Sequence, residues 1–348
     1  MLLARAPLRI SFGGGATDLE AYYARYGGLV ISATINKYIY SIVTKNFDAN
    51  LQMISADYQS VFNMPQYGPP EQDGAFHLPR AVLDHFNLKL PINVFIASEV
   101  PPGTGLGSSG AIAVNLINVF GFLSERPVSK QEAAELAYYV EVKKLGAPVG
   151  KQDQYASAFG GLNCFRFEVD KVVVEPLALP RSTIRKLERN LMLFFTGNSR
   201  KAWDILRQQE SSTAKNDGIV IESLHRIKAL AEEMRQALEK EKLHRFGELL
   251  DESWRNKKKL ASNISNSTID EAYLAAKKAG AVGGKISGAG GGGFLMIYCE
   301  TEDQPKVRAA LAEKGFHEMR FAFEFEGARI ILNTASTASS VSWEGWED

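Results

Sequence analysis

The stretch from Gly103 to Gly110 places four glycines and two serines within eight residues. It follows the strand-like run Ile92–Ala97 and precedes an apolar segment of helical length that ends at Leu123. A loop without side chains lets backbone N–H groups approach an anion, and a helix that starts at its end adds unpaired N–H groups and a partial positive charge. The pattern predicts a strand, a phosphate-binding loop and a helix, in that order. The alternative is a tight strand-to-helix turn.

The type of phosphate loop is partly decided by its neighbours. No Walker A pattern is present, but Gly105–Gly110 matches the dinucleotide-binding pattern G-x-G-x-x-G of NAD-dependent oxidoreductases. That pattern requires a second strand after the helix and an acidic residue about 20 residues further on. Here Ser129 and Glu132 form a capping-box signature and Gly146 marks a stop, which predicts a second helix over Ser129–Leu145. The sequence therefore favours a coincidental match over an oxidoreductase.

Two further glycine clusters flank this loop in the sequence. Gly283–Gly293 holds seven glycines in eleven residues, far above the average content of 30 glycines in 348 residues. Such a run is needed where the backbone takes unusual dihedral angles or approaches another group closely, although a structural bulge is the alternative. Gly13–Gly15 follows a strand and is followed by Thr17 and Asp18. The Asp18 carboxylate is suited to accept hydrogen bonds from a polyol.

Two acidic residues are informative because of their positions. Glu141 falls on the apolar side of the predicted helix, opposite Glu132. A buried carboxylate needs a cation or hydrogen bonds, so a magnesium ligand and a buried salt bridge are both open for it. Asp153 lies beyond the helix, where the chain is expected to turn from Pro148 onward. Alone, it is typical of a turn or cap residue.

The rest of the chain predicts strands early and helices late. The charge-laced segment Ala202–Lys259 predicts helices with breaks at Gly218 and Gly247. Its Lys-rich end, Arg255–Lys259, predicts a solvated helix face. The Ser- and Thr-rich residues Asn333–Asp348 predict a disordered tail. Three segments rich in β-branched and aromatic residues predict further strands: Leu2–Phe12, Leu29–Thr44 and Phe294–Cys299.

Composition excludes some classes of protein. The 40 Lys and Arg residues balance 40 Asp and Glu residues, which argues against a general nucleic-acid binder. The longest apolar run, Ala111–Leu123, is too short to cross a bilayer, and the N-terminus shows no secretory signal. Cys164 and Cys299 stand singly in apolar surroundings, as reduced thiols do. We therefore expect a cytoplasmic protein with no membrane partner and no nucleic-acid partner.

Taken in order, the three glycine loops resemble those of the GHMP kinase superfamily, named for galactokinase, homoserine kinase, mevalonate kinase and phosphomevalonate kinase. The resemblance implies a two-domain α/β (α+β) fold. It comprises an N-terminal domain of the ribosomal protein S5 domain 2-like type, a C-terminal ferredoxin-like domain and an active site in the cleft between them. We place these domains at residues 1–185 and 186–332, with the tail at 333–348. The matching segments are Arg9–Asp18, Pro101–Ser109 and Lys285–Gly293.

Within that superfamily, Gly13–Asp18 and Lys151–Gly161 are most similar to the D-glycero-D-manno-heptose 7-phosphate kinases. The resemblance implies an ATP-dependent kinase that phosphorylates the anomeric hydroxyl of that sugar, giving the 1,7-bisphosphate in nucleotide-activated heptose biosynthesis. A 1-kinase for fucose, mannose, galactose or a uronic acid stays open. One departure is that the subgroup often reads Gly-Leu-Gly-Gly-Ser-Ser, whereas this chain reads Gly-Leu-Gly-Ser-Ser-Gly from Gly105. Ser109 is common to both patterns, which favours it over Ser108 as a metal ligand.

The resemblance also implies roles for individual residues. Asp153 matches the family's catalytic aspartate and Arg9 its basic partner, while Ser109 and Glu141 match the residues that hold Mg²⁺. Their joint presence disfavours a non-catalytic sugar-sensing relative. The implied ATP-binding residues are Pro101, Gly103, Thr104, Gly105, Leu106, Gly107, Ser108, Ser109 and Gly110. The implied substrate-binding residues are Gly14, Gly15, Thr17, Asp18, Lys151, Gly288 and Gly290.

A phosphorylated sugar adds a further requirement. Its phosphate needs Lys or Arg partners that form charge-assisted hydrogen bonds. Lys151 is the first candidate because it lies two residues from Asp153, while Arg80, Arg200 and Lys201 stay open. The expected partner is a small-molecule sugar or sugar phosphate. A homodimer is an expectation at the level of the family alone.

Overall fold

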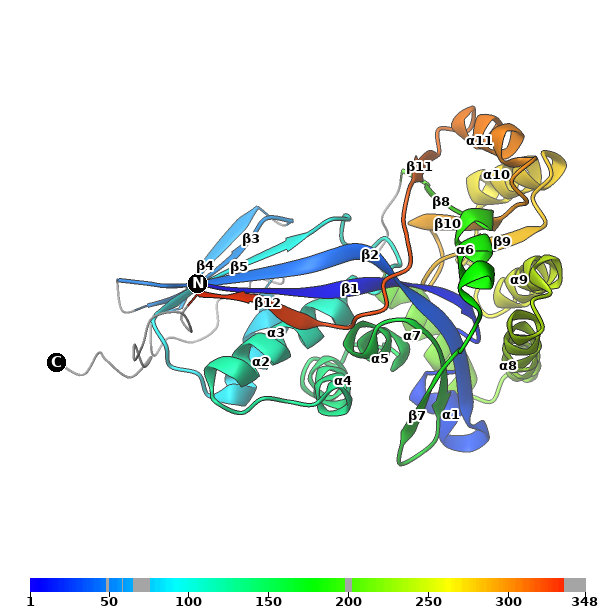
Figure 1. Cartoon of the computed structure of the whole chain (residues 1–348). Coiled ribbons are helices and arrows are strands. Elements are labelled where there is room, and N and C mark those ends of the chain that lie inside the picture. The colour runs from blue at the N-terminus through cyan, green and yellow to red at the C-terminus, as the bar shows by residue number, and fades with distance from the viewer. Residues whose placement is uncertain (48–49, 58, 65–75, 198–201, 335–348) are drawn as a thin grey trace.

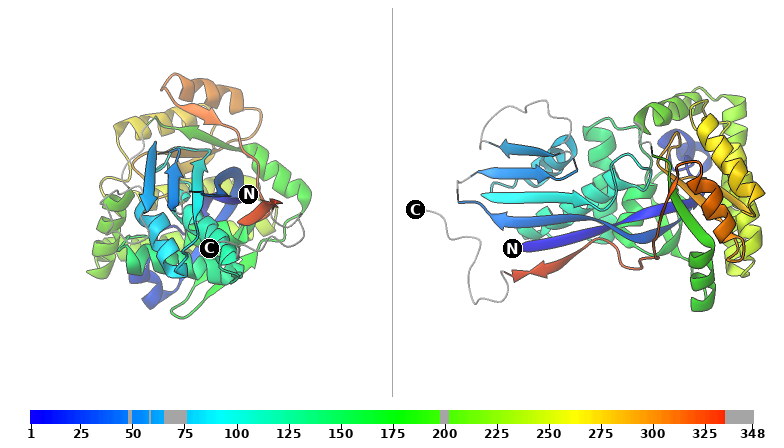
Figure 2. Two further views of the ribbon diagram at one scale, coloured as in Figure 1. Left: turned by 90° about the vertical axis from the view of Figure 1, so that its left-hand side faces the viewer. Right: turned by 90° about the horizontal axis from the view of Figure 1, so that it is seen from above.

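Two β-sheets lie one after the other along the long axis of the molecule (Figure 1). The computed structural model describes residues 1–47, 50–57, 59–64, 76–197 and 202–334. The long strands β1 (Leu2–Gly13) and β2 (Gly28–Lys45) run from the first sheet toward the second (Figure 2).

Among the described residues, the first sheet has eight strands in the order β12-β1-β2-β5-β3-β4, with β6 pairing β2 and β7 pairing β6. The first part of β2, residues 28–33, pairs with β6, and its last part, residues 39–45, pairs with β5. Within the described part of this sheet, β3 and β5 pair in parallel, and the other neighbouring strands pair antiparallel. The bounds of the remaining strands are β3 (Leu51–Ser55), β4 (Ser60–Met64), β5 (Ile92–Ser98), β6 (Leu162–Phe167), β7 (Val172–Pro176) and β12 (Arg329–Asn333).

Helices cover one face of this sheet (Figure 1). The central one is apolar nearly all round and buried, as expected of a helix inside a core. Its Asn115 Nδ2 donates to the Ile39 carbonyl at 3.2 Å, which satisfies that donor in the core, while Asn115 Oδ1 has no partner among the described residues. No described helix is long and apolar enough to cross a membrane. The bounds are α2 (His77–Phe86), α3 (Ser108–Leu123), α4 (Lys130–Tyr139) and α5 (Gln152–Phe159), of which α3 is the central helix.

The second sheet has the order β11-β8-β10-β9, which in chain order is 4-1-3-2. This is the strand order of a ferredoxin-like sheet, and it confirms the C-terminal part of the predicted fold class. A second buried core packs Trp254, Tyr273 and Ile286 around it. The strands are β8 (Leu191–Phe195), β9 (Gly283–Ile286), β10 (Phe294–Tyr298) and β11 (His317–Met319). The helices of this half, together with the N-terminal α1, are α1 (Glu20–Tyr26), α6 (Arg181–Asn190), α7 (Ala202–Ala214), α8 (Gly218–Glu239), α9 (Leu243–Lys257), α10 (Ser267–Lys278) and α11 (Gln304–Ala312).

Several sequence predictions are corrected by these elements. The strands expected near the N-terminus are confirmed by β1, β2 and β5. The single helix expected over Ser129–Leu145 has its predicted capping box but changes to a π-helical segment at Val140–Lys144. The turn expected up to Asp153 ends earlier, because α5 begins at Gln152.

Of the two helix breaks expected in the second half, one is confirmed and one is wrong. The helix break near Gly218 is confirmed, since α7 ends at Ala214 and α8 starts at Gly218. The break at Gly247 is wrong: Gly247 lies inside α9, where a Cβ atom would approach Tyr298 to 2.5 Å. Glycine is present there for close packing against β10, not to end a helix.

The end of the described chain returns to the first sheet. In β12, Asn333 pairs with Leu2, so the predicted tail begins too early at Asn333. Most of that tail, residues 335–348, lies outside the described residues. The domain boundary after residue 185 falls within α6, and β12 belongs to the N-terminal sheet although it follows residue 186. The division at residues 185 and 186 stays a prediction.

Candidate active site

A cavity of about 960 Å³ is walled by elements of both sheets. From the first half it takes β1, the loop after it and the starts of α3 and α5; from the second half it takes α7, α9 and the loop after β9. Segments at opposite ends of the sequence therefore share one wall.

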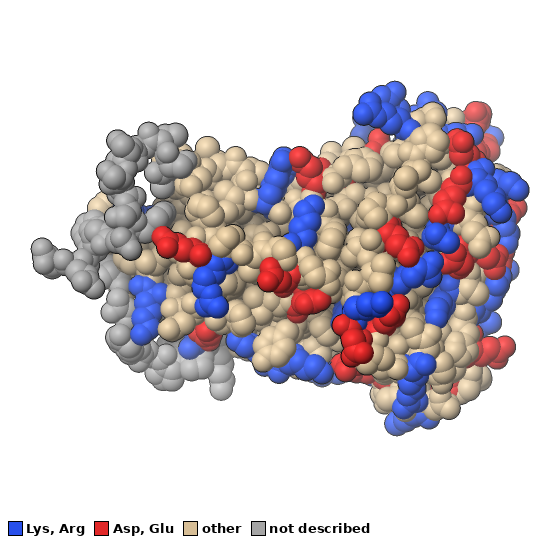
Figure 3. Space-filling model, turned by 60° about the horizontal axis from the view of Figure 1, so that its bottom comes forward, with Lys and Arg blue, Asp and Glu red and all other residues tan. Residues whose placement is uncertain are grey.

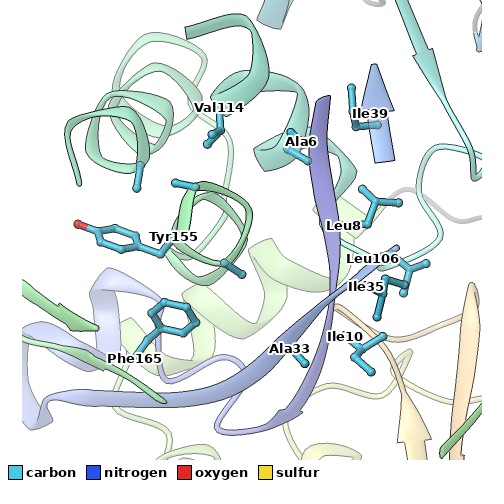
Figure 4. Packing of buried hydrophobic residues seen from close by; sticks show 14 of the residues in the cluster. Ala6, Leu8, Ile10, Ala33, Ile35, Ile39, Leu106, Val114, Tyr155 and Phe165 are labelled. Carbon is cyan, nitrogen blue, oxygen red and sulfur yellow. The ribbon is translucent and has the colours of Figure 1, made fainter. Parts of the chain in front are cut away.

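The middle glycine loop, Gly103–Gly110, forms one side of this cavity. Gly103, Gly105 and Gly107 all have φ between 75° and 80°, a region that L side chains rarely adopt. Leu106 anchors the loop because its fully buried side chain joins the core beside Leu8 and Ile35 (Figure 4). The helix α3 starts directly after it, so the loop and the first turn of α3 present backbone N–H groups to the cavity.

The C-terminal glycine loop, Gly283–Gly293, contacts the middle loop directly. A Cβ atom on Gly288 would lie 2.6 Å from the Gly105 Cα atom, and one on Gly293 would lie 2.2 Å from the Thr104 carbonyl oxygen. The Ser287 hydroxyl donates to the Gly105 carbonyl at 3.0 Å. The glycines are therefore required where two backbones touch, which settles the choice between a bulge and a close approach in favour of the latter.

Arg9 and Asp153 form an ion pair at the junction of these loops. Arg9 Nε and Nη2 donate to Asp153 Oδ1 at 2.8 and 2.6 Å, and Nη1 donates to the Gly105 carbonyl at 2.6 Å. The Arg9 side chain is buried, while that of Asp153 is one quarter exposed toward the cavity. Gly110 makes this approach possible, since a Cβ atom there would lie 2.9 Å from the Asp153 Cβ atom.

Asp18 lies on the loop after β1 and is almost completely buried. Its two carboxylate oxygens accept from the backbone N–H groups of Ala16 and Gln152, each at 3.1 Å. Burial raises the pKa of Asp18 to about 6, although the Gln152 hydrogen bond opposes the rise. Two other polar atoms in the wall, Ser11 Oγ and Gln152 Oε1, have no hydrogen-bond partner among the described residues. Such groups are suited to bind a polar ligand.

Glu141 lies in the π-helical segment and is 3% exposed. Its carboxylate accepts from Gln154 Nε2 at 2.6 Å. Burial raises its pKa to about 7, against the opposing effect of hydrogen bonds from Gln154 and Ser109. The described residues give Glu141 no Lys or Arg partner, so the buried salt bridge considered from the sequence is absent. No group of three or more His, Cys, Asp or Glu residues within the described ranges could by itself hold a metal ion.

Comparison with known proteins decides the family. A model of the GHMP kinases N terminal domain matches residues 76–161, and one of the GHMP kinases C terminal domain matches residues 234–317. The chain is 33% identical over 331 residues to the D-glycero-alpha-D-manno-heptose 7-phosphate kinase of Campylobacter jejuni, with 93% of this chain and 97% of that protein covered. The chain belongs to the GHMP kinases.

Two further relatives support this assignment. The crystal structure of a D-glycero-D-manno-heptose 1-phosphate kinase from Bacteroides thetaiotaomicron superposes with a TM-score of 0.78 at 31% identity, covering 96% of this chain and 99% of that one. The L-fucokinase/L-fucose-1-P guanylyltransferase of Bacteroides fragilis is 26% identical, covering 91% of this chain but 38% of that longer protein. As a GHMP kinase, the chain is an ATP-dependent phosphotransferase, and its two-part fold is the one predicted.

The cavity of this GHMP kinase includes part of the predicted residue set. Arg9, Asp153, Glu141 and the predicted loop residues Gly103, Gly105, Gly107, Ser108 and Ser109 line it, as do Gly15, Asp18 and Gly288. The described cavity wall does not include Pro101, Thr104, Leu106, Gly110, Gly14, Thr17, Lys151 or Gly290. Several of these support the wall from behind: the Thr17 hydroxyl, for example, lies within hydrogen-bond distance of both the Gly14 and the Leu29 carbonyl.

Lys151 is the predicted phosphate partner that the fold places elsewhere. Its ammonium lies over the rings of Tyr23 and Tyr138, 4.7 and 5.2 Å from their centroids. Arg80 forms an ion pair with Asp84 on α2, and Arg200 and Lys201 lie outside the described residues. The sequence candidates therefore supply no phosphate partner in the described cavity wall.

Sequence reasoning missed two lysines in this wall. Lys257 is 5% exposed and Lys285 is 2% exposed, and both line the cavity. The solvated face predicted for Arg255–Lys259 is therefore wrong for Lys257. A signal was available, because Leu250, Trp254 and Lys257 follow the spacing of one helix face.

Proposed function

We propose that this GHMP kinase transfers the γ-phosphoryl group of ATP to the anomeric hydroxyl of a heptose phosphate. The observation that carries the proposal is the Arg9–Asp153 pair, held against the Gly105 carbonyl at the junction of both glycine loops. The names of the Campylobacter and Bacteroides relatives support a heptose phosphate as the acceptor. The proposed product of a 7-phosphate is the 1,7-bisphosphate.

The proposed reaction uses the residues of the wall in distinct roles. Asp153 orients the acceptor hydroxyl and takes its proton as the hydroxyl oxygen forms a bond to the γ-phosphorus and the bond to the ADP oxygen breaks. Arg9 holds the Asp153 carboxylate in place and adds positive charge beside the transferred group. Backbone N–H groups of the middle loop and the start of α3 bind the ATP phosphates.

The donor set near Ser109 fits a magnesium ion. Glu141 is a buried carboxylate without a cationic partner among the described residues, and it lies beside the Ser109 hydroxyl at the start of α3. Oxygen donors of this kind suit Mg²⁺, which is commonly bound by one or two protein groups together with substrate phosphates. When bound there, Mg²⁺ would neutralise charge on the ATP phosphates.

We also propose that the sugar ring lies against the loop after β1. Asp18, Ser11 and Gln152 carry acceptor groups on this side of the cavity, and two of these atoms lack a partner. A fucose 1-kinase is a second candidate, favoured by the likeness to the L-fucokinase of Bacteroides fragilis. The cytoplasmic location and the homodimer expected from the sequence stay predictions.

A substrate panel scored by ADP release tests the proposal. Heptose 7-phosphate should be the preferred acceptor over mannose, fucose, galactose and their 6-phosphates. Preference for fucose would replace the heptose assignment with the second candidate. Absence of transfer to every sugar, with folded protein and magnesium present, would contradict the proposed function.

A further inference from the structure

Two buried lysines in the cavity wall have no role in the proposed reaction. Lys257 ends α9, and Lys285 lies on β9, within the glycine-rich segment Gly283–Gly293. Each is more than nine-tenths buried. Burying an ammonium group costs several kcal/mol unless an anion or several hydrogen bonds compensate, so their presence needs a reason.

The described residues supply little of that compensation. The Lys257 amine donates to the Gly288 carbonyl, and the Lys285 amine donates to the Phe12 carbonyl at 3.4 Å. An ammonium has three donors, and no ion-pair partner occurs for either lysine within the described part of the chain. The acidic residue that influences both, Asp18, already accepts two backbone N–H groups.

Neighbouring positive charges further disfavour the charged form of both lysines. The two lysines repel each other, and Arg9 lies close enough to affect both. Burial lowers the pKa of Lys257 to about 7 and holds that of Lys285 well below its ordinary value, with the neighbouring cations adding to both shifts. Of the nearby carboxylates, Asp153 is already paired with Arg9, and Asp18 acts on both lysines without forming an ion pair with either among the described residues.

The contacts of Lys257 show where an anion would bind. The Lys257 amine donates a hydrogen bond to the Gly288 carbonyl, and the Gly288 backbone packs against Gly105. The Gly105 carbonyl in turn accepts a hydrogen bond from Arg9. Lys257 therefore lies where both glycine loops meet the Arg9–Asp153 pair, and Lys285 lines the same cavity close enough to Lys257 and Arg9 for their charges to affect it. An anion there gains charge-assisted hydrogen bonds from donors that are already desolvated and fixed.

We propose that Lys257 and Lys285 bind a phosphate dianion that one of the two substrates brings into the cavity. This inference rests on the proposed function. The dianion is either the phosphate of the sugar or the γ-phosphoryl group of ATP, and both have the same chemistry. Lys257 and Lys285 would then take the phosphate-binding role that the sequence predicted for Lys151.

Replacing Lys257 with methionine tests the inference. Met retains the length of the side chain and removes its charge, while Lys259→Met is the control on the exposed end of the same segment. For each variant, kcat/KM is measured with heptose 7-phosphate and with unphosphorylated heptose, together with the KM for ATP. We expect Lys257→Met to lose about tenfold to a hundredfold in kcat/KM for the phosphorylated sugar, and Lys259→Met to match the wild type.

The pattern of loss identifies the source of the phosphate. Loss confined to the phosphorylated sugar supports binding of the sugar phosphate. Equal loss on both sugars, with a raised KM for ATP or a lower kcat, supports binding of the γ-phosphoryl group. Unchanged kinetics in Lys257→Met would overturn the inference. The proposed function would stand in that case, provided that the wild type phosphorylates the heptose.

A stability readout separates ligand binding from a structural role. Inorganic phosphate should raise the melting temperature of the wild type and of Lys259→Met by more than that of Lys257→Met. The melting temperature of ligand-free Lys257→Met should equal or exceed that of the wild type, because a buried charge has been removed. If the melting temperature of Lys257→Met is below that of the wild type, Lys257→Arg serves as a second variant. Loss of both stability and activity in Lys257→Arg would show a structural role for Lys257 and overturn the inference.

Discussion

Arg9 donates two hydrogen bonds to Asp153 and a third to the Gly105 carbonyl, so one guanidinium fixes both the acidic residue and the glycine loop. Residues 9, 105 and 153 come from β1, the loop before α3 and the first turn of α5. The planar, multiply donating geometry of arginine suits this linkage, and lysine could not reproduce it. The proposed acceptor site and the proposed ATP-binding loop are thereby held at a set distance from each other.

Replacing Asp153 with asparagine should leave ATP binding near normal and lower turnover about a hundredfold or more. Asn fills the same space and keeps the contact with Arg9, but it is a poor proton acceptor. Calorimetric ATP affinity and steady-state kcat check the two halves of this prediction. Asp170→Asn, on an exposed hairpin, is the control. Near-normal turnover would make Asp153 a helix N-terminal residue without a catalytic role.

Replacing Glu141 with glutamine should raise the magnesium concentration needed for half-maximal activity. The amide fills the same site but is a weaker ligand for a hard divalent cation. Activity titrated against magnesium at saturating ATP measures this effect, with thermal unfolding as a check of the fold. A wild-type magnesium requirement in a folded variant would show that Glu141 does not contribute to metal binding.

Replacing Gly105 with alanine should damage the contact between the two glycine loops. The new Cβ atom would lie 2.5 Å from the Ser287 carbonyl oxygen, in addition to the strain of φ = +80°. Gly146→Ala is the matched control, because its φ is +65° and no heavy atom lies within 4 Å. We expect about 1 kcal/mol of destabilisation in the control and more in Gly105→Ala, with a higher KM for ATP. Equal effects in urea unfolding and kinetics would contradict the role of this contact.

Lys257 should make the stability of the ligand-free protein depend on pH. Folding lowers its pKa from 10.5 to about 7, so between these values the unfolded state binds more protons than the folded state. The destabilisation is fully present below about pH 7 and is lost as the pH rises toward 10, on the order of a few kcal/mol. The stability advantage of Lys257→Met over the wild type should therefore shrink between pH 7 and pH 9.5 in urea unfolding. An advantage that is independent of pH would contradict this assignment.

The glycine loops could be predicted from the sequence because their backbone conformation and close contacts require glycine. Gly103–Gly110 predicted a strand, a loop and a helix, and β5 and α3 confirm both flanking elements. The approach of Gly288 to Gly105 could not be predicted, since it depends on how the second sheet is placed against the first.

Side-chain direction accounts for most of the missed residues. Lys151 and Gln152 are neighbours in sequence, yet Gln152 lines the cavity and Lys151 lies on Tyr23 and Tyr138. A run of lysines is typical of solvated surface, so the sequence pattern predicts the same solvent exposure for Lys257 as for its neighbours. Charged residues of both signs are indeed mixed over the face in Figure 3, and a single buried lysine among them has no compositional signature.

The position of the new phosphate on the sugar decides whether transfer goes to the anomeric hydroxyl. Wild-type protein, ATP, magnesium and heptose 7-phosphate are incubated, and the product is examined by phosphorus and proton NMR. We expect a second phosphate whose phosphorus couples to the anomeric proton, formed in step with ADP and greatly slowed in Asp153→Asn. A phosphate on any other hydroxyl, or ADP release without a sugar bisphosphate, would contradict this expectation.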